Sequence, residues 1–344
     1  MVLILGVDPV SVIGGTVAVA LFGILAGLVF MGIERKFAAR MQARIGPPIR
    51  QPFRDVAKLL AKDSIVPENA IPCLFNMAPV LALASSIVIL LYIPLGGFLP
   101  VLAGYGDLIL VMYLLTLPAL ALVAGGFASG SPYATVGSQR EMVTMMSYEL
   151  PLAIAVIAIA WRLAAAGIAD PFSLATIAGT ASGITIWSVV GPLGVIGCVL
   201  LLIVLTWVTP AELSRVPCDT PEAETELCGG LLVEYSGRNL ALFYLAQGVK
   251  TVAMAALAVA LFLPWNISWF VALSPNAALA ADFAFFLLKI LAVIFFSVSV
   301  IRVGMARFRI THVVSIYWGY LGGLGLLGLV FMVLDAYIGG GGVL

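Results

Sequence analysis

The chain has 344 residues, of which 62% are hydrophobic and only 10% charged, and its mean hydropathy is +1.16. Soluble globular proteins carry about 25% charged residues, so this composition excludes them and indicates an integral membrane protein. The 17 basic and 17 acidic residues cancel to a formal net charge of zero. Nothing therefore suggests nucleic acid as a partner, and the positions of the charges become the informative feature.

Long uncharged runs predict the membrane spans, because a spanning helix needs about 20 mostly apolar residues. Two further spans must contain charged residues, and the total is eight. The sequence thus predicts an all-α, polytopic membrane protein with a single membrane domain over 1–344. Its expected parts are helix 1 (1–33), a basic loop with an amphipathic helix (34–70), helices 2–5 (71–209), an acidic cytoplasmic loop (210–239) and helices 6–8 (240–344).

Basic residues gather in alternate connections between the spans. Arg162 is the one base in the other set of connections. Because cytoplasmic loops are enriched in Lys and Arg, we expect the basic connections to face the cytoplasm and both termini to lie outside the cell membrane. The cytoplasmic bases are Arg35, Lys36, Arg40, Arg44, Arg50, Arg54, Lys58, Lys62, Arg140, Arg215, Arg238, Arg302, Arg307 and Arg309.

Between the first two spans, "QPFRDVAKLLAKDSIVP" predicts an amphipathic helix. Its apolar positions share one face, and Arg54, Lys58 and Lys62 share another. Such a helix lies along the membrane interface or docks on another subunit, and the two arrangements are compatible. The apolar face consists of Phe53, Val56, Leu59 and Leu60.

Two carboxylates occur in the fourth predicted span, "GSQREMVTMMSYELPLA". The uncharged run between Glu149 and Arg162 is too short to cross a membrane, so Glu149 must lie within the span. Charges at that depth usually face a partner or a hydrated cavity. Glu141 is eight residues earlier and can line the same side of such a cavity, or it can pair with a base such as Arg140.

The segment between the fifth and sixth spans, "SRVPCDTPEAETELCGG", is rich in acids. Asp219 before Thr220-Pro221 is a helix-start signal in which the aspartate caps the helix. Capping does not explain six carboxylates. Closely spaced acids raise one another's pKa, which suits proton exchange, whereas the simpler interpretation is a solvated acidic loop. Its apolar flanks favour partial burial. The six are Glu212, Asp219, Glu222, Glu224, Glu226 and Glu234.

The seventh predicted span contains Asp282 and Lys289, which are seven residues apart and so share a face. Lys289 needs an acidic partner or must lose its charge. A structural ion pair and a role in ion movement are both consistent with this pattern.

Motifs for catalysis or for cofactors are absent from the sequence. Cys73, Cys198, Cys218 and Cys228 have no CxxC spacing, so we expect free thiols and no metal or cofactor site in this chain. His312 is the only histidine, which makes an acid-base triad improbable. The chain is therefore expected to be a non-catalytic subunit.

Four segments together resemble a known family. They are "ERKFAARMQARIGPP" (34–48), "SPYATVGSQREMVTMMSYELPLA" (131–153), "AELSRVPCDTPEAETELCGGLLVEYSG" (211–237) and "ARFRITHVVSIYWG" (306–319). In this order, within eight spans, they are similar to the H subunit (subunit 1) of respiratory complex I and to its relatives in group 4 membrane-bound nickel-iron hydrogenases.

One departure favours the hydrogenase branch. Complex I members typically continue R-x-G-P with N-R-V-G-P, whereas here Gly46-Pro47-Pro48-Ile49 runs directly into "RQPFRDVAKLL". The resemblance then implies a membrane anchor and coupling subunit of an ion-translocating, hydrogen-evolving complex. Its nickel-iron centre and iron-sulfur clusters would belong to partner subunits. Those partners are the hydrogenase large and small subunits, an iron-sulfur subunit and antiporter-like membrane subunits, within a lipid bilayer.

The resemblance also implies roles for individual residues. Glu141, Glu149 and the six acids of 212–234 match the acidic path that joins the redox arm to the membrane. Arg35, Arg44, Arg215, Arg307 and Arg309 match positions that hold the cytoplasmic loops and contact the arm. The alternatives are the H subunit of a quinone-reducing complex I, in which quinone binding would be expected, and a stand-alone transporter or structural anchor.

Overall fold

A computed structural model describes residues 9–180, 183, 185–271 and 274–338. Within these residues eight helical spans are long and apolar enough to cross a membrane, which confirms the predicted number and the all-α class. They are α1 (Pro9–Met41), α3 (Pro72–Tyr92), α4 (Leu108–Ala128), α5 (Pro132–Ala165), α8 (Pro192–Glu212), α10 (Gly237–Phe262), α11 (Pro275–Ile294) continuing through η4 (Phe295–Val300) and α12 (Ile301–Gly304), and α13 (Ile310–Val314) continuing through η5 (Ser315–Leu321) and α14 (Gly322–Ile338).

Several helices extend further into charged sequence than the uncharged runs predict. Helix α1 continues to Met41, so the first bases of the 34–70 segment lie on a helix. Helix α10 begins at Gly237, ahead of the expected bound at 240, and both Arg238 and Lys250 lie inside it. Prolines in the first turns of α3, α5, α8 and α11 fix where those helices start. The positions of charged residues therefore indicate only approximately where the helices end and the loops begin.

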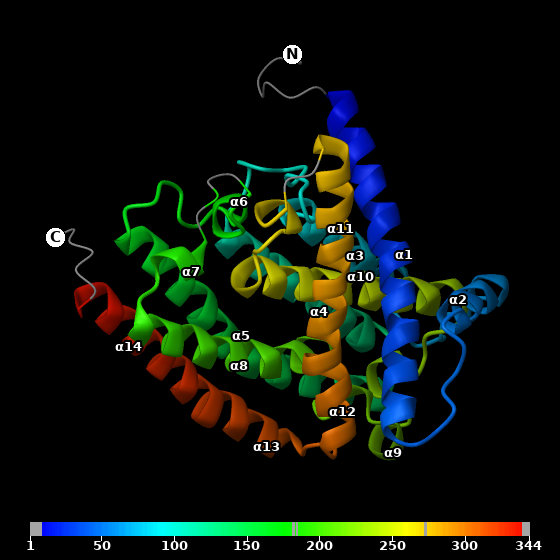
Figure 1. The fold of residues 1–344 in the computed structure, drawn as a ribbon. Coiled ribbons are helices and arrows are strands. Elements are labelled where there is room, and N and C mark those ends of the chain that lie inside the picture. Colours follow the sequence, from blue (N-terminus) through cyan, green and yellow to red (C-terminus); the bar gives the residue numbers. More distant parts are fainter. Residues whose placement is uncertain (1–8, 181–182, 184, 272–273, 339–344) are drawn as a thin grey trace, which may run out of the picture.

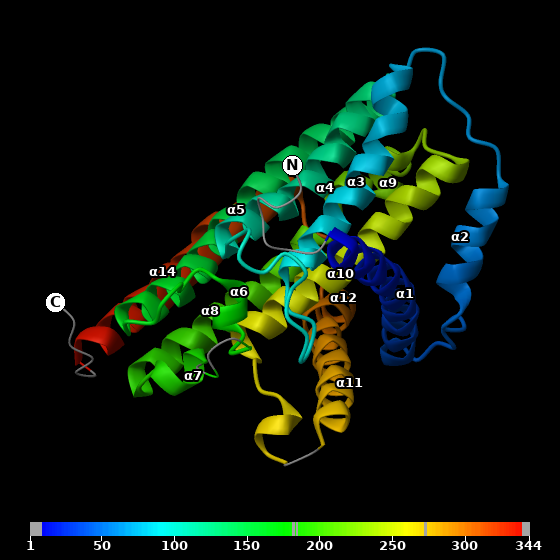
Figure 2. The same cartoon turned by 90° about the horizontal axis from the view of Figure 1, so that it is seen from above.

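Helix α10 is the centre of the molecule, and most of its side chains are buried. It packs against α1, α3 and α11, while α5, α8 and α14 form a slanted group on the other side (Figures 1 and 2). In Figure 1, α1 begins at the top, and α9, α12 and α13 lie near the bottom edge, from which α14 rises. That edge also carries the acidic segment.

Glycines allow two of these helix pairs to approach closely. A Cβ at Gly27 of α1 would lie 2.6 Å from the carbonyl carbon of Gly248 in α10. A Cβ at Gly197 of α8 would lie 2.8 Å from the carbonyl oxygen of Gly328 in α14. Small residues at such crossings permit backbone contact, which is the usual way in which membrane helices associate.

The predicted amphipathic helix is α2 (Gln51–Ala61). It buries Pro52 and Val56 and packs against α10 and α1. Figures 1 and 2 show it beside the bundle, apart from the layer of spanning helices. The prediction of an amphipathic helix is confirmed.

The acidic segment folds into three short turns between α8 and α10. These are η1 (Thr220–Glu222), α9 (Glu224–Leu227) and η2 (Gly230–Leu232), all of which contact α5. On the opposite side of the protein, α6 (Leu174–Ile177) and α7 (Ile186–Val189) precede α8. There Arg162 pairs with Asp335 of α14 at 3.0 Å, so the one base expected outside is neutralised within the chain.

Candidate functional site

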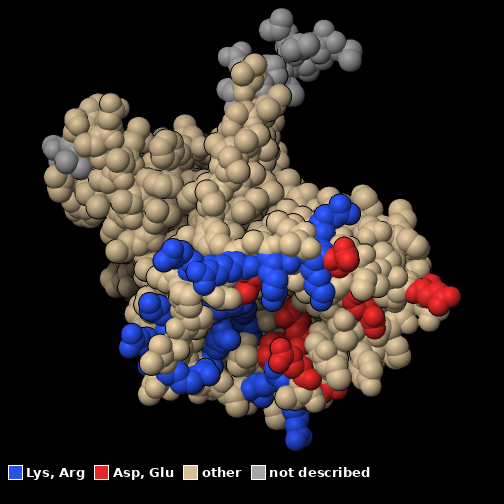
Figure 3. Space-filling view, turned by 90° about the vertical axis from the view of Figure 1, so that its right-hand side faces the viewer, with Lys and Arg blue, Asp and Glu red and all other residues tan. Residues whose placement is uncertain are grey.

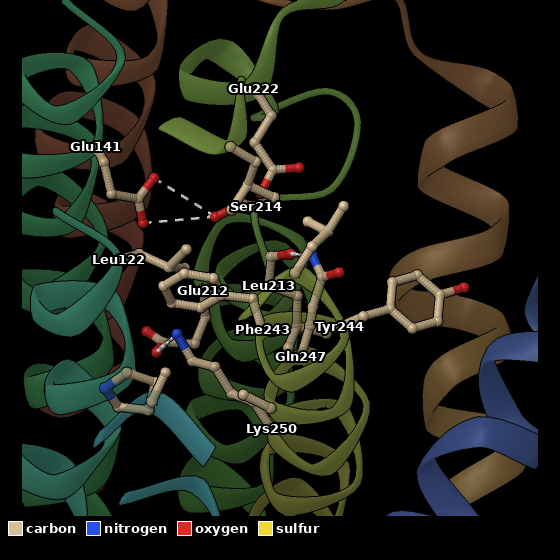
Figure 4. Close-up of a pocket in the computed structure, with 15 residues that line it drawn as sticks. Leu122, Glu141, Glu212, Leu213, Ser214, Glu222, Phe243, Tyr244, Gln247 and Lys250 are labelled. Atoms are coloured by element: carbon tan, nitrogen blue, oxygen red, sulfur yellow. Dashed lines mark hydrogen bonds and ion pairs between the residues drawn. The ribbon is translucent and has the colours of Figure 1, made fainter. Parts of the chain in front are cut away.

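A cavity beneath the acidic segment brings together residues from α5, α8 and α10 (Figure 4). Its volume is about 50 Å³, enough for a few water molecules. Most of its lining is apolar, with polar groups in a cluster. The polar lining residues are Glu141, Glu212, Ser214, Glu222, Tyr244, Gln247 and Lys250.

At the deep end of the cavity, Glu212 forms an ion pair with Lys250. The Lys250 Nζ lies 2.8 Å from Glu212 Oε1, and Lys250 and Glu212 are 6% and 1% exposed. Glu212 is the last residue of α8, and Lys250 projects from the middle of α10. Removing either partner would leave a buried charge without compensation, so the pair fixes the contact between the two helices.

Glu141 lies on the α5 side of the cavity and is 1% exposed. The Ser214 hydroxyl donates to both of its carboxylate oxygens, at 3.4 and 3.5 Å (Figure 4). Ser214 has a φ of 47°, an uncommon left-handed conformation for a residue other than glycine. Gln247 donates to the neighbouring Leu213 carbonyl oxygen at 3.3 Å, which helps to hold this corner in place. The alternative pairing of Glu141 with Arg140 is not formed.

Glu222 closes the cavity on the side of the acidic segment. Burial raises the pKa of this half-buried carboxyl, while the Arg215 charge lowers it and the nearby Asp219 and Glu224 charges raise it. The charges of Glu222 and Glu212 both act on Glu141. Three carboxyls therefore share one small site with a single ammonium group, and such coupled groups exchange protons as a unit.

Two other acids of the segment form ion pairs outside the cavity. Arg307 donates to both carboxylate oxygens of Asp219, at 2.6 and 2.8 Å, and Asp219 makes no side-chain cap. The prediction that Asp219 caps a helix was therefore wrong, because a bidentate Arg pair takes both oxygens. Glu226 pairs with Arg140 at 2.5 Å. These pairs tie the segment to the α12–α13 connection and to α5.

The remaining predicted acids lie apart from the cavity. Glu149 is half-buried on α5, within the span as expected, and its charge acts on Glu212. Glu224 is exposed on α9 and Glu234 is half-buried after η2. The structure thus gathers Glu141, Glu212 and Glu222, and it does not bring all eight acids into one site.

Most of the predicted arm-contact arginines have partners within the chain. Arg35 pairs with Asp55 at 3.2 Å and donates to the Tyr244 hydroxyl. Arg215 lies 3.9 Å from Glu34, a buried carboxylate that Arg302 also contacts at 3.0 Å.

Two of these arginines remain more open. Arg309 is exposed, and Arg44, also exposed, donates to Gln42 beside a cavity of about 400 Å³. Figure 3 shows Lys and Arg side chains around a group of Asp and Glu side chains on the surface of this face. The predicted roles in contacting an arm stay predictions.

Asp282 and Lys289 do not pair with each other. Lys289 donates to the Leu263 and Trp265 carbonyl oxygens, each at 2.8 Å. It thus provides a hydrogen-bond donor for backbone carbonyl groups just after the end of α10. Asp282 accepts from the Ser268 backbone amide at 2.9 Å and from its hydroxyl at 2.6 Å. Both side chains hold the α10–α11 connection, a structural role that the spacing of seven residues did not reveal.

Sequence reasoning missed Lys250, Glu34 and Ser214. Lys250 lies inside an otherwise apolar stretch of α10, and that position was the available signal. Glu34 was overlooked because bases follow it closely in the sequence. Nothing local marks Ser214, whose role depends on a residue 73 positions away.

Within the residues described, no group of three or more His, Cys, Asp or Glu side chains is placed to hold a metal ion. Cys218 is buried and contacts the Tyr317 hydroxyl at 3.3 Å. Chemically, the site offers proton binding and charge compensation. The fold and this site define a multi-pass membrane protein with a buried carboxylate cluster at one face.

The family described as NADH dehydrogenase matches residues 15–333, and the chain belongs to it, as a protein of the same type as the H subunit of complex I. It is 33% identical over 316 residues to the H subunit of NADH-quinone oxidoreductase from Brevibacillus brevis, covering 88% of this chain and 87% of that protein. It is also 34% identical over 290 residues to hydrogenase-4 component C of Escherichia coli, covering 84% and 86%.

Archaeal relatives extend the same comparison. Identity to the H subunit of F(420)H(2) dehydrogenase from Methanosarcina acetivorans is 32% over 339 residues, covering 92% of this chain and 93% of that protein. A chain of the membrane-bound sulfane sulfur reductase, an archaeal respiratory membrane complex, has a similar structure, with a TM-score of 0.80 and 28% identity, covering 93% of this chain and 99% of that one. The relatives are thus subunits of multi-subunit respiratory membrane complexes.

Proposed function

We propose that this chain is the membrane anchor and coupling subunit of an ion-translocating, hydrogen-evolving nickel-iron hydrogenase complex. The observation that carries the proposal is the buried cluster of Glu141, Glu212 and Glu222 around one cavity with Lys250. A cluster of this kind at the face expected to meet the redox arm is suited to convert a charge change into proton transfer.

The cluster has one ammonium group for three carboxyls, so its proton content responds to nearby charge. Asp219 and Arg307 tie the acidic segment above it to the α12–α13 connection. A redox partner docked there would alter the field at Glu222 first and, through Ser214, at Glu141. Glu149, two turns further along α5, is the next acid towards the membrane.

The nickel-iron centre and iron-sulfur clusters would lie in partner subunits, which are the hydrogenase large and small subunits and an iron-sulfur subunit. Antiporter-like membrane subunits would continue the ion path. We infer that the basic face is cytoplasmic and that both termini lie outside. The exposed Arg44 and Arg309 would contact the arm directly, and the paired Arg35, Arg215 and Arg307 would shape the surface.

The direct passage from Gly46-Pro47-Pro48 into α2 supports the hydrogenase assignment, as does the similarity to a hydrogenase-4 component. The second candidate is the H subunit of a quinone-reducing complex, which the similarity to the corresponding subunit of NADH-quinone oxidoreductase favours. The carboxylate cavity, at about 50 Å³, is far below the roughly 300 Å³ of small-molecule pockets. The carboxylate cavity therefore suits water and protons better than a quinone, whereas the cavity of about 400 Å³ beside Arg44 is within the size range of small-molecule pockets.

Two measurements on the purified complex in vesicles test these proposals. Hydrogen evolution from a reduced viologen, compared with quinone reduction, distinguishes the two candidates. Glu141→Gln and Glu222→Gln should each lower ion uptake about tenfold or more, whereas Glu224→Gln, an exposed acid of the same segment, should not. Wild-type ion uptake in both cavity variants would refute the coupling role. Purification without any partner subunits would instead favour a stand-alone transporter or an anchor.

A further inference from the structure

Helix α2 divides its surface into three sectors. Pro52 and Val56 are buried against the bundle. At 3.6 residues per turn, Phe53, Ala57 and Leu60 form the neighbouring sector, in which Ala57 is exposed and Leu60 is 54% exposed. The bases Arg54 and Lys58 form the next sector, Lys62 follows at the C-terminal end of the helix, and all three are exposed.

These three bases are the basic stripe of α2. Within the described residues, their side chains form no ion pair with an acid of this chain, whereas Arg35 nearby is paired with Asp55. Asp55 also accepts from Gln51 at 2.9 Å, so the acid of α2 is already engaged. The stripe presents three uncompensated charges, two along one side of the helix and one at its C-terminal end. Figure 3 shows a row of basic side chains on the face that carries α1 and α2.

An apolar sector next to a basic stripe, on a helix held against a membrane bundle, matches the boundary between hydrocarbon and phosphate head groups. A hydrophilic partner protein would complement the charges but would leave Leu60 and the neighbouring alanine facing water or polar surface. The exposed Ile65 just beyond α2, 66% exposed, extends the apolar sector along the chain. The arrangement therefore favours a lipid surface over a soluble acidic protein.

We propose that the basic stripe of α2 is a binding surface for anionic phospholipids, with the Phe53–Leu60 sector inserted at the acyl boundary. The bases contact the head-group phosphates of the cytoplasmic leaflet. Each base near an anionic leaflet strengthens attraction by about fivefold at low salt, and the effect weakens as salt screens it. This surface does not depend on which electron donor or ion the complex uses.

The test places an environment-sensitive fluorophore at Ala57→Cys in the intact complex, in a background with Cys73 and Cys228 replaced by Ser. In nanodiscs of phosphatidylcholine, added phosphatidylglycerol should shift the emission to the blue. Arg54→Gln with Lys58→Gln should raise the phosphatidylglycerol fraction needed for half the shift by about fivefold or more. Arg54→Lys with Lys58→Arg should keep it unchanged.

A control variant, Arg40→Gln, removes an exposed base of α1 and should leave the lipid dependence intact. Emission that stays aqueous in every lipid would overturn the proposal. So would a stripe variant that keeps the wild-type lipid response but loses the hydrophilic subunits on purification, because the stripe would then be a protein-docking surface.

Discussion

At the residue scale, substitutions in the ion pair of Lys250 and Glu212 test whether this pair serves the packing of α8 on α10 or the coupling to ion movement. Lys250→Met leaves Glu212 as a buried, uncompensated carboxylate, and we expect a loss of about 3–5 kcal/mol of stability. Combining it with Glu212→Gln removes both charges and should recover most of that loss. The measurement is a double-mutant cycle on the thermal midpoint of the purified complex.

The same cycle separates structure from function. If the double variant is stable and yet translocates no ions, the pair belongs to the coupling cluster. A stable double variant with full ion uptake would show that the pair only joins α8 to α10.

Glu222 and Glu226 belong to the same acidic segment, and their contributions to stability should depend on pH in opposite ways. Burial raises the pKa of Glu222, so its contribution to stability is present below the unfolded-state pKa and is lost as pH rises through the folded-state pKa. Gln mimics the protonated form. Glu222→Gln should therefore raise the thermal midpoint at alkaline pH and leave it unchanged at acidic pH.

For Glu226 the sign reverses. The hydrogen bond from Arg140 lowers its pKa, so its contribution is present above the unfolded-state pKa and is lost as pH falls through the folded-state pKa. Glu226→Gln should slightly lower the midpoint at neutral pH and match wild type in acid, since exposed pairs contribute little. Parallel pH profiles for the two variants would contradict both assignments.

At the scale of elements, Gly230 determines the shape of the acidic segment. Its φ is +53°, and a Cβ there would lie 1.9 Å from the Pro221 carbonyl oxygen, which is a backbone atom that has no room to move. Gly230→Ala should therefore displace η1 and Glu222 from the cavity. We expect impaired assembly or ion uptake reduced about tenfold or more, measured on the purified complex in vesicles.

Gly167 supplies the control, because it has a φ of +75° with nothing within 4 Å of an added Cβ. Gly167→Ala bears only the backbone penalty of about 1–2 kcal/mol. Equal effects of the two substitutions would show that the contact with Pro221 is unimportant.

Sequence patterns predicted these elements unevenly. Hydropathy gave the number of spans, because a membrane requires length and apolarity wherever the chain crosses it. It did not reveal the buried charge of Lys250 inside α10, because the partner, Glu212, belongs to another helix. The local Asp-Thr-Pro signal failed at Asp219 because its partner, Arg307, is 88 residues away. Glu141 and Glu222 were identified as candidates, but which acids meet depends on tertiary packing.

At the scale of the whole molecule, the charge distribution predicts a fixed orientation in the membrane. Exposed residues near opposite ends of the bundle provide reporters. Glu68 lies in the α2–α3 connection, and Ala169 lies in the α5–α6 connection. If the basic connections are cytoplasmic, the first faces the cytoplasm and the second faces outward.

Glu68→Cys and Ala169→Cys, each in a background with Cys73 and Cys228 replaced by Ser, should respond oppositely to a membrane-impermeant maleimide. Intact cells should label Ala169→Cys and not Glu68→Cys, and inside-out vesicles should reverse the pattern. Cys198 and Cys218 are buried, and burial raises the pKa of the Cys218 thiol to about 11, so background labelling near neutral pH should be low. Labelling of both positions from one side would contradict the assigned topology. Labelling of Glu68→Cys in intact cells would also remove the acidic cluster from the face on which we place the redox arm.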